Sequence, residues 1–310
     1  MRFDELAIHH KPIHFHASMP MINPVSFLSI REIVSMPRTV FEETCRSQAT
    51  GYYLGEHTVL CRILGKYKFY VDTRDTSLAP HLIMDGFWES WITRFMQTIV
   101  KPGDVCIDIG ANFGYYSVLM AALSGENGRT IAIDANPNLC RLIERSVATN
   151  GQRVNIVNKA VSNKSEKVTL NIPNGFWGGA SIRTNFPQID TTRLKVQAVT
   201  LDTLLRDLEV AKVDIVKMDC EGVEPMILEG MRQTIKANPD IQIVMEFTPH
   251  DYRDPQGFVN YLCSTFNVKR IEGDSSLRVI TDEELNQFAY IRDHMDLHLT
   301  VKKTESHKGE

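Results

Sequence analysis

The sequence predicts a doubly wound α/β fold built on a mostly parallel, seven-stranded, Rossmann-like sheet. From residue 101 onward, apolar runs alternate with helical stretches, which is the one-dimensional pattern of a parallel sheet with crossover helices. Several of these runs are apolar at nearly every position, as expected of strands that are buried on both faces. The predicted strands lie at 105–109, 130–134, 154–157, 213–218, 241–247, 268–271 and 297–302.

Helical stretches fill the intervals between these strands. The predicted helices cover 115–123, 137–150, 223–237 and 257–266. Another helix is predicted to begin after Thr281, because Thr281 and Glu284 have the spacing of a capping box, in which each side chain accepts an orphan backbone amide. Ligands of such sheets bind at the carboxyl ends of the strands, so functional residues are sought there.

The first hundred residues lack this alternation and are predicted to form an α+β accessory segment or cap. Proline-bounded segments at 25–34 and 38–46 are candidate short helices. Runs at 58–64 and 68–73 predict a β-hairpin, and a helix is predicted at 87–100. The expected organisation is a cap at 1–100, an α/β domain at 101–302 and a disordered polar tail at 303–310.

The composition is that of an enzyme-sized globular protein. Its 310 residues include 34 basic and 38 acidic side chains, a formal charge of -4, which excludes a nucleic-acid binder that relies on bulk positive charge. Six cysteines stand without a CxxC pair, so neither a disulfide framework nor a zinc ribbon is expected. No uncharged run approaches the roughly 20 residues of a membrane span, and no secretory signal is recognised. We therefore expect a cytoplasmic protein that does not span a membrane.

A glycine turn follows the first strand of the α/β domain. Gly110 lets the backbone bend and lets a ligand approach closely, while Gly114 lets the next helix pack against the strand. Asp134 ends the following strand and is placed to accept hydrogen bonds from ribose hydroxyls. Asn112 departs from the glycine pattern of a dinucleotide site, and Asp108 suits a cationic ligand better than a diphosphate. The residues thus predict a nucleoside site with an acidic edge.

Two motifs give this site a family resemblance. Asp108-x-Gly110-x-Asn112-x-Gly114 resembles the first motif of class I S-adenosylmethionine-dependent methyltransferases. The stretch from Lys217 to Glu224 is similar to the K-x-D-x-E-G-x-E signature of the FkbM family of methyltransferases. The resemblance spans about 101–250, and it implies a class I fold, S-adenosylmethionine as methyl donor and O-methylation of sugars and natural products.

The resemblance and the strand ends together nominate the site residues. Donor contacts are expected from Asp108, Gly110, Asn112, Gly114, Asp134 and Ala160. A general base is sought among Asp219, Glu246 and His250, because the two acids end neighbouring strands and a histidine has a suitable pKa. Acceptor contacts are expected from Trp177, Glu221 and Glu224, although a macrodipole role for Glu224 and a packing role for Trp177 are equally open. No metal is expected.

Three classes of function stay open at this point. The favoured one is a methyltransferase acting on a hydroxyl of a carbohydrate or secondary metabolite, with N-methylation of an amine as a variant on the same fold. The others are an NAD-dependent oxidoreductase and a noncatalytic nucleoside-binding scaffold. The expected partner is a small-molecule or glycan acceptor and not a nucleic acid. The oligomeric state is left open, a homo-oligomer included.

Overall fold

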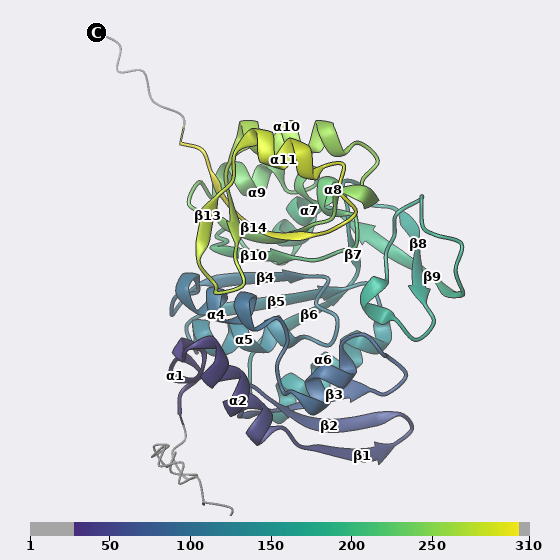
Figure 1. The fold of residues 1–310 in the computed structure, drawn as a ribbon. Helices are drawn as coiled ribbons and strands as arrows, with labels where there is room; N and C mark the ends of the chain where they lie inside the picture. Colours follow the sequence, from purple (N-terminus) through teal and green to yellow (C-terminus); the bar gives the residue numbers. More distant parts are fainter. Residues whose placement is uncertain (1–27, 304–310) are drawn as a thin grey trace, which may run out of the picture.

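A computed structural model describes residues 28–303 of the chain, and its centre is an eight-stranded mixed sheet (Figure 1). Five strands in the middle and at one edge run parallel, and the three remaining strands pair antiparallel. In spatial order the strands are β13 (Leu277–Val279), β12 (Phe266–Ile271), β14 (Met295–Val301), β11 (Gln242–Phe247), β10 (Ile215–Met218), β4 (Val105–Ile109), β5 (Arg129–Asp134) and β6 (Val154–Asn158). The predicted α/β fold is confirmed, with one strand more than expected.

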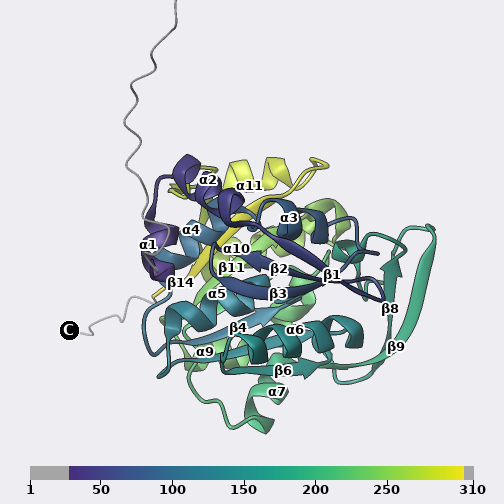
Figure 2. The same ribbon diagram turned by 90° about the horizontal axis from the view of Figure 1, so that it is seen from below.

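Helices cover both faces of the sheet (Figures 1 and 2). On one face lie α4 (Ser90–Ile99), α5 (Tyr115–Ser124) and α6 (Pro137–Thr149). On the other lie α7 (Leu201–Asp207), α8 (Glu224–Glu229), α9 (Arg232–Ala237), α10 (Pro255–Thr265) and α11 (Asp282–Phe288). Successive side chains of a strand point to opposite faces of the sheet and belong to two separate hydrophobic cores. Ile215, for example, packs on the first face and Val216 on the second. This explains why the buried strands are apolar at every position.

The cap is a layer that packs on the first face of the sheet. It consists of α1 (Ile30–Ser35), α2 (Arg38–Gln48), a sheet of β1 (Gly51–Gly55), β2 (Thr58–Ile63) and β3 (Tyr67–Asp72), and α3 (Ala79–Met84) with the segment that follows it as far as Glu89. The backbone of β3 is tied to α6, because the Tyr70 amide donates to Ser146 Oγ at 3.0 Å and Asn150 Nδ2 donates to the Lys68 carbonyl at 2.7 Å. One continuous core joins the cap to α4, α5 and α6.

Several elements differ from the sequence-based predictions for identifiable reasons. Strand β13 was missed because it is short and its side chains are largely exposed, so it leaves no apolar run. The helix predicted at 223–237 is broken into α8 and α9 at Gly230, where a Cβ would overlap the Ser162 carbonyl oxygen. The capping box at Thr281 is confirmed, with both reciprocal hydrogen bonds present. The tail predicted at 303–310 lies outside the described residues from position 304.

Strands of a third sheet interrupt the α/β alternation. They are β7 (Ala160–Val161), β8 (Lys167–Pro173) and β9 (Thr191–Val199), with the short 3-10 helix η1 (Trp177–Gly179) between the last two. The segment around Trp177 is therefore the connection of a β-hairpin. In the part of the chain that the structure describes, no helix is both long and apolar enough to cross a membrane.

The shared core predicts that the cap and the α/β domain unfold together. Phe41 of α2 is fully buried, whereas its neighbour Val40 is 41% exposed. Phe41→Ala is expected to lower the free energy of unfolding by about 3 to 5 kcal/mol in a single transition, and Val40→Ala by less than about 0.5 kcal/mol. Denaturant titration followed by circular dichroism and tryptophan fluorescence would measure both. Separate cap and domain transitions would contradict the prediction.

Candidate active site

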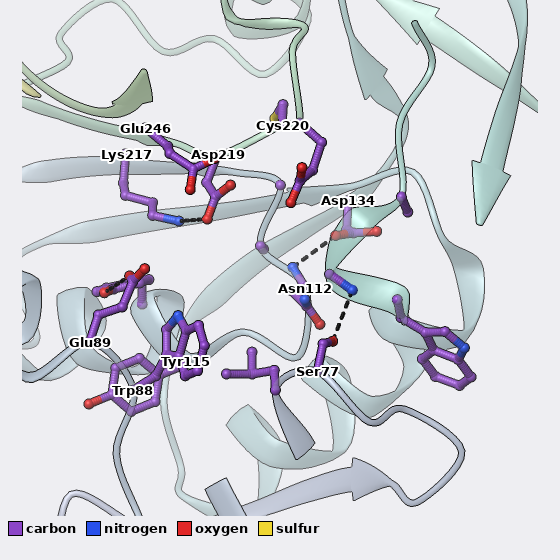
Figure 3. A pocket seen from close by; sticks show the side chains of 18 of the residues that line it. Ser77, Trp88, Glu89, Asn112, Tyr115, Asp134, Lys217, Asp219, Cys220 and Glu246 are labelled. Atoms are coloured by element: carbon purple, nitrogen blue, oxygen red, sulfur yellow. Dashed lines mark hydrogen bonds and ion pairs between the residues drawn. The ribbon is translucent and has the colours of Figure 1, made fainter. Parts of the chain in front are cut away.

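A cleft of about 840 Å³ opens at the carboxyl ends of the central strands. Its walls come from three parts of the chain: the loops after β4, β5, β10 and β11, the cap, and the hairpin connection around Trp177. Figure 3 shows acids and one lysine from the sheet on one side of this cleft and cap residues on the other. The cap therefore contributes to the site, and the lining includes most of the segment 85–91, which the sequence offers as a possible wall of the acceptor cleft.

The turn after β4 requires glycine because another strand end lies against it. Gly110 has a φ of 76°, and a Cβ at this position would overlap the carbonyl oxygen of Asp219. Gly114 has a φ of 89°, and a Cβ there would approach Ile143 of α6 to 2.9 Å. Gly110 lines the cleft, while Gly114 allows close helix packing behind it.

Asn112 and Asp134 form the nucleoside-facing part of the cleft. The backbone amide of Asn112 donates to Asp134 Oδ2 at 2.8 Å (Figure 3). The backbone amide of Asn136 donates to Asp134 Oδ1 at 2.7 Å. Burial raises the pKa of the Asp134 carboxyl to about 7, although both amides favour the charged form. Among the described residues, Asn112 Oδ1 is buried without a hydrogen-bond partner. These groups fit a nucleoside ligand that donates hydroxyl hydrogen bonds.

Asp108 lies behind the glycine turn instead of on the cleft wall. Its side chain is fully buried, Oδ2 accepts a hydrogen bond from Ser117 Oγ at 2.5 Å, and Oδ1 has no partner within the described chain. Burial raises the pKa of Asp108, and the nearby Lys217 charge opposes that rise. The donor contact predicted for Asp108 is therefore at most indirect and electrostatic in this arrangement.

Three carboxyl groups converge at the ends of β10 and β11. Oxygens of Asp219, Glu221 and Glu246 all lie within 4.8 Å of one another. Lys217 Nζ lies 3.1 Å from Asp219 Oδ2 and 4.6 Å from the centre of the Tyr116 ring. Burial and the Asp219 charge raise the pKa of Glu246 to about 10 and that of Glu221 to about 8. Such oxygens could also hold a divalent cation, so the expectation of a metal-free site stays a prediction.

Glu224 and His250, two of the predicted site residues, do not line the cleft. Glu224 is fully buried and accepts the backbone amides of Cys220 and Gly222 at 2.7 and 3.1 Å, so its carboxyl holds the turn after β10. His250 lies on the short 3-10 helix η2 (Pro249–Asp251), 3.7 Å from the Asp251 carboxyl, and it does not line the cleft. Their predicted substrate and base roles stay predictions: Glu224 is not one of the three convergent carboxyls, and neither residue lines the cleft.

Hydrogen bonds join the hairpin connection around Trp177 to the cap, next to the part of the cleft that Asn112 and Asp134 line. Asp75 is 1% exposed, and its Oδ1 accepts the Trp177 amide at 2.9 Å. Ser77 Oγ accepts the Gly178 amide at 3.1 Å, and the Trp177 ring stacks on Phe113 with centroids 6.2 Å apart. Trp177 and Ala160 both line the cleft. Asp75 and Ser77 were missed because only the fold brings residues 75 and 177 together.

Glu89 belongs to the segment 85–91 that the sequence offers as a possible cleft wall, but no individual role is predicted for it. It comes from the cap, lines the cleft opposite Lys217 and Asp219, and has a left-handed backbone with a φ of 37° (Figure 3). Burial and the charge of Asp296 raise the pKa of its carboxyl to about 8. No periodic pattern or motif marks this position in the sequence.

Comparison with known proteins identifies the family. The model of the methyltransferase FkbM domain matches residues 108–298, which is more than half of the chain. The chain belongs to the FkbM methyltransferase family. It is an S-adenosylmethionine-dependent methyltransferase, and this decides among the three classes that the sequence left open. The match covers Gly110, Asn112 and Asp134 as well as the three convergent carboxyls.

Solved structures with a similar fold share little sequence with this FkbM methyltransferase. They include a precorrin-6y C5,15-methyltransferase from Geobacter metallireducens, with 15% identity and a TM-score of 0.39 over 72% of this chain and 91% of that one. An rRNA methylase from Streptococcus thermophilus has 9% identity and a TM-score of 0.40 over 68% and 95% of the two chains. Likenesses this distant say nothing about the acceptor. No curated protein matches the chain.

The close contact between Gly110 and Asp219 predicts that a Cβ at position 110 strongly weakens ligand binding. Gly110→Ala is expected to weaken binding of S-adenosylhomocysteine by at least about tenfold, because the turn after β4 must shift away from the end of β10. Gly103→Ala is the matched control, since Gly103 also has a positive φ, of 89°, but has open space around its Cβ position. Calorimetry on both variants would test this. Equal losses would assign the effect to backbone strain alone.

The raised pKa of Asp134 predicts a pH-dependent affinity for the nucleoside. The ionised carboxylate is expected to accept the ribose hydroxyls, so protonation below pH 7 should compete with binding. The dissociation constant of 5′-methylthioadenosine, which carries the nucleoside without the amino-acid end of the donor, is expected to rise about tenfold from pH 8 to pH 6. Asp134→Asn should bind weakly with no such slope. A slope that survives in this variant would contradict the assignment.

Proposed function

We propose that this FkbM methyltransferase methylates a hydroxyl group of a carbohydrate or a similar polyhydroxylated metabolite. The observation that supports this most is the convergence of Asp219, Glu221 and Glu246 beside the nucleoside-facing residues. Carboxyl groups suit an acceptor with several hydroxyls, because each oxygen can accept a hydroxyl hydrogen bond. The Trp177 ring on the same cleft can pack against a sugar ring.

The donor half of the cleft is assigned to the turn after β4 and the end of β5. Asp134 would accept hydrogen bonds from the ribose hydroxyls, and Ala160 would contact the adenine. The backbone at Gly110 and Asn112 would lie in close contact with the donor. When bound, S-adenosylmethionine supplies a methyl group that its sulfonium already makes electrophilic. The protein therefore has to place the acceptor oxygen, exclude water and accept one proton.

Asp219 is the group that we assign as general base. Its carboxyl is oriented by the Lys217 ammonium at 3.1 Å, and it lies at the end of β10, next to Gly110. The pKa of Glu246, raised to about 10, makes it a neutral acid near pH 7, so Glu246 is suited to donate a hydrogen bond to the acceptor. With the donor bound, Asp219 would take the hydroxyl proton as the methyl group passes to the acceptor oxygen, and the broken carbon–sulfur bond would leave S-adenosylhomocysteine.

The charge of the acceptor half favours neutral acceptors over polyanions. Asp219, Glu221 and Glu246 converge beside Lys217, and the lining of the cleft also includes the basic residues Arg38, Arg46 and Lys159. A phosphate chain placed at the ends of β10 and β11 would meet the three convergent carboxyls, whose negative charge repels it. This supports a small-molecule or glycan acceptor.

Substitution of Asp219 separates donor binding from chemistry. Asp219→Asn is expected to keep the S-adenosylhomocysteine dissociation constant within about twofold and to lower methyl transfer by about 10² to 10⁴. Transfer of labelled methyl groups to a panel of neutral mono- and oligosaccharides would measure the second effect.

His250→Ala tests the alternative base in the same assay. Because His250 does not line the cleft, its removal should change turnover by less than about twofold. Full activity of Asp219→Asn, or a large loss in His250→Ala, would overturn the assignment. Lack of transfer to every sugar despite tight S-adenosylhomocysteine binding would redirect the search to other hydroxylated metabolites.

A further inference from the structure

Glu89 is held in the cleft by a strained backbone. It occupies the N-cap position of α4 with φ 37° and ψ 70°, a left-handed conformation that non-glycine residues rarely adopt. An N-cap carboxyl commonly accepts a backbone amide of its own helix, yet this one makes no such hydrogen bond. The side chain instead extends toward Lys217 and Asp219 (Figure 3).

One oxygen of this carboxyl has a partner and the other is open. Tyr116 Oη donates to Glu89 Oε2 at 2.6 Å, which fixes the orientation of the group. Oε1 accepts no hydrogen bond from any residue in the described part of the chain, and the residue lines the cleft. The cap therefore presents one oriented acceptor oxygen to whatever fills this space.

The strand order places this oxygen along the path of the donor. Asp134 ends β5, the turn at Gly110 ends the adjacent β4, and Lys217 lies on the next strand, β10. Neighbouring strands are about 4.8 Å apart. A donor whose ribose is held at the end of β5 and which extends across the turn after β4 therefore reaches the end of β10 with its amino-acid end. There Glu89 faces Tyr116, while Glu246 lies one strand further, on β11.

The charges at this place suit a cationic group. Glu89, Asp108 and Asp219 surround the single ammonium of Lys217, so carboxyls outnumber cations. The end of S-adenosylmethionine that lies beyond its ribose carries an ammonium as well as the sulfonium. We propose that Glu89 accepts a hydrogen bond from the ammonium of the donor's amino-acid end, and that the cap in this way selects the donor. The proposal rests on the donor and is independent of the proposed acceptor.

Two ligands that differ in this end of the donor test the proposal by calorimetry. A bound ammonium favours the ionised form of the Glu89 carboxyl, whose pKa of about 8 lies close to the pH of the measurement if this is set at 8. At that pH Glu89→Gln is expected to weaken S-adenosylhomocysteine by about tenfold or more, as typical for losing one charge-assisted hydrogen bond. Binding of 5′-methylthioadenosine, which lacks the amino-acid end, should change by less than twofold. Glu42→Gln removes the same charge from the rim of the same cleft and should leave both affinities unchanged.

Tyr116→Phe gives a second variant in which the Glu89 carboxyl is kept. Loss of the hydroxyl that orients Glu89 should weaken S-adenosylhomocysteine by a smaller factor and again spare 5′-methylthioadenosine. Unchanged S-adenosylhomocysteine binding in Glu89→Gln would overturn the proposal, and Glu89 would then be assigned to acceptor binding instead. Equal weakening of both ligands would also overturn it, because the loss would then come from the shape of the cleft. None of these outcomes depends on which acceptor is methylated.

Discussion

The buried ammonium of Lys217 is the charge on which the active site depends. Burial alone lowers the pKa of a lysine, but the charges of Asp219, Asp108 and Glu89 together raise it above its ordinary value. The ammonium therefore stays charged without water around it, and it makes the nearby carboxyls tolerable in a buried place. Since Lys217 and Asp219 belong to β10, Asp108 to β4 and Glu89 to the cap, one cation couples three parts of the chain.

This coupling gives the cap a chemical purpose. A layer that packed on the sheet only to bury apolar surface would not need polar contacts at the cleft, yet Asp75 and Ser77 hold the hairpin connection and Glu89 faces the strand ends. The donor half and the acceptor half of the cleft thus share a wall that lies outside the segment from 108 to 298 that matches the FkbM domain. Changes in the cap can alter ligand selection while leaving the sheet intact.

The division of labour among the acids follows from their surroundings. Glu246 and Glu221 lose water and lie near the Asp219 charge, so their pKa values rise and they hold protons more readily. Asp219 has a cation at hydrogen-bond distance, which the other two do not have within the described residues. These surroundings are the basis on which we propose Asp219 as the base, Glu246 as a hydrogen-bond donor and Glu221 as a contact of the acceptor.

The sequence by itself determined the α/β fold, the glycine turn and the family, because these depend on local patterns: buried strands read as apolar runs, and Gly110 and Asp134 follow strand ends at fixed spacing. It also placed Asp219 and Glu246 at neighbouring strand ends. Only the tertiary structure decided that Glu224 holds a backbone turn, that His250 lies off the cleft and that Glu89 faces Lys217. Those outcomes depend on contacts between residues far apart in the chain, and side-chain direction at a loop or cap leaves no periodic signal in the sequence.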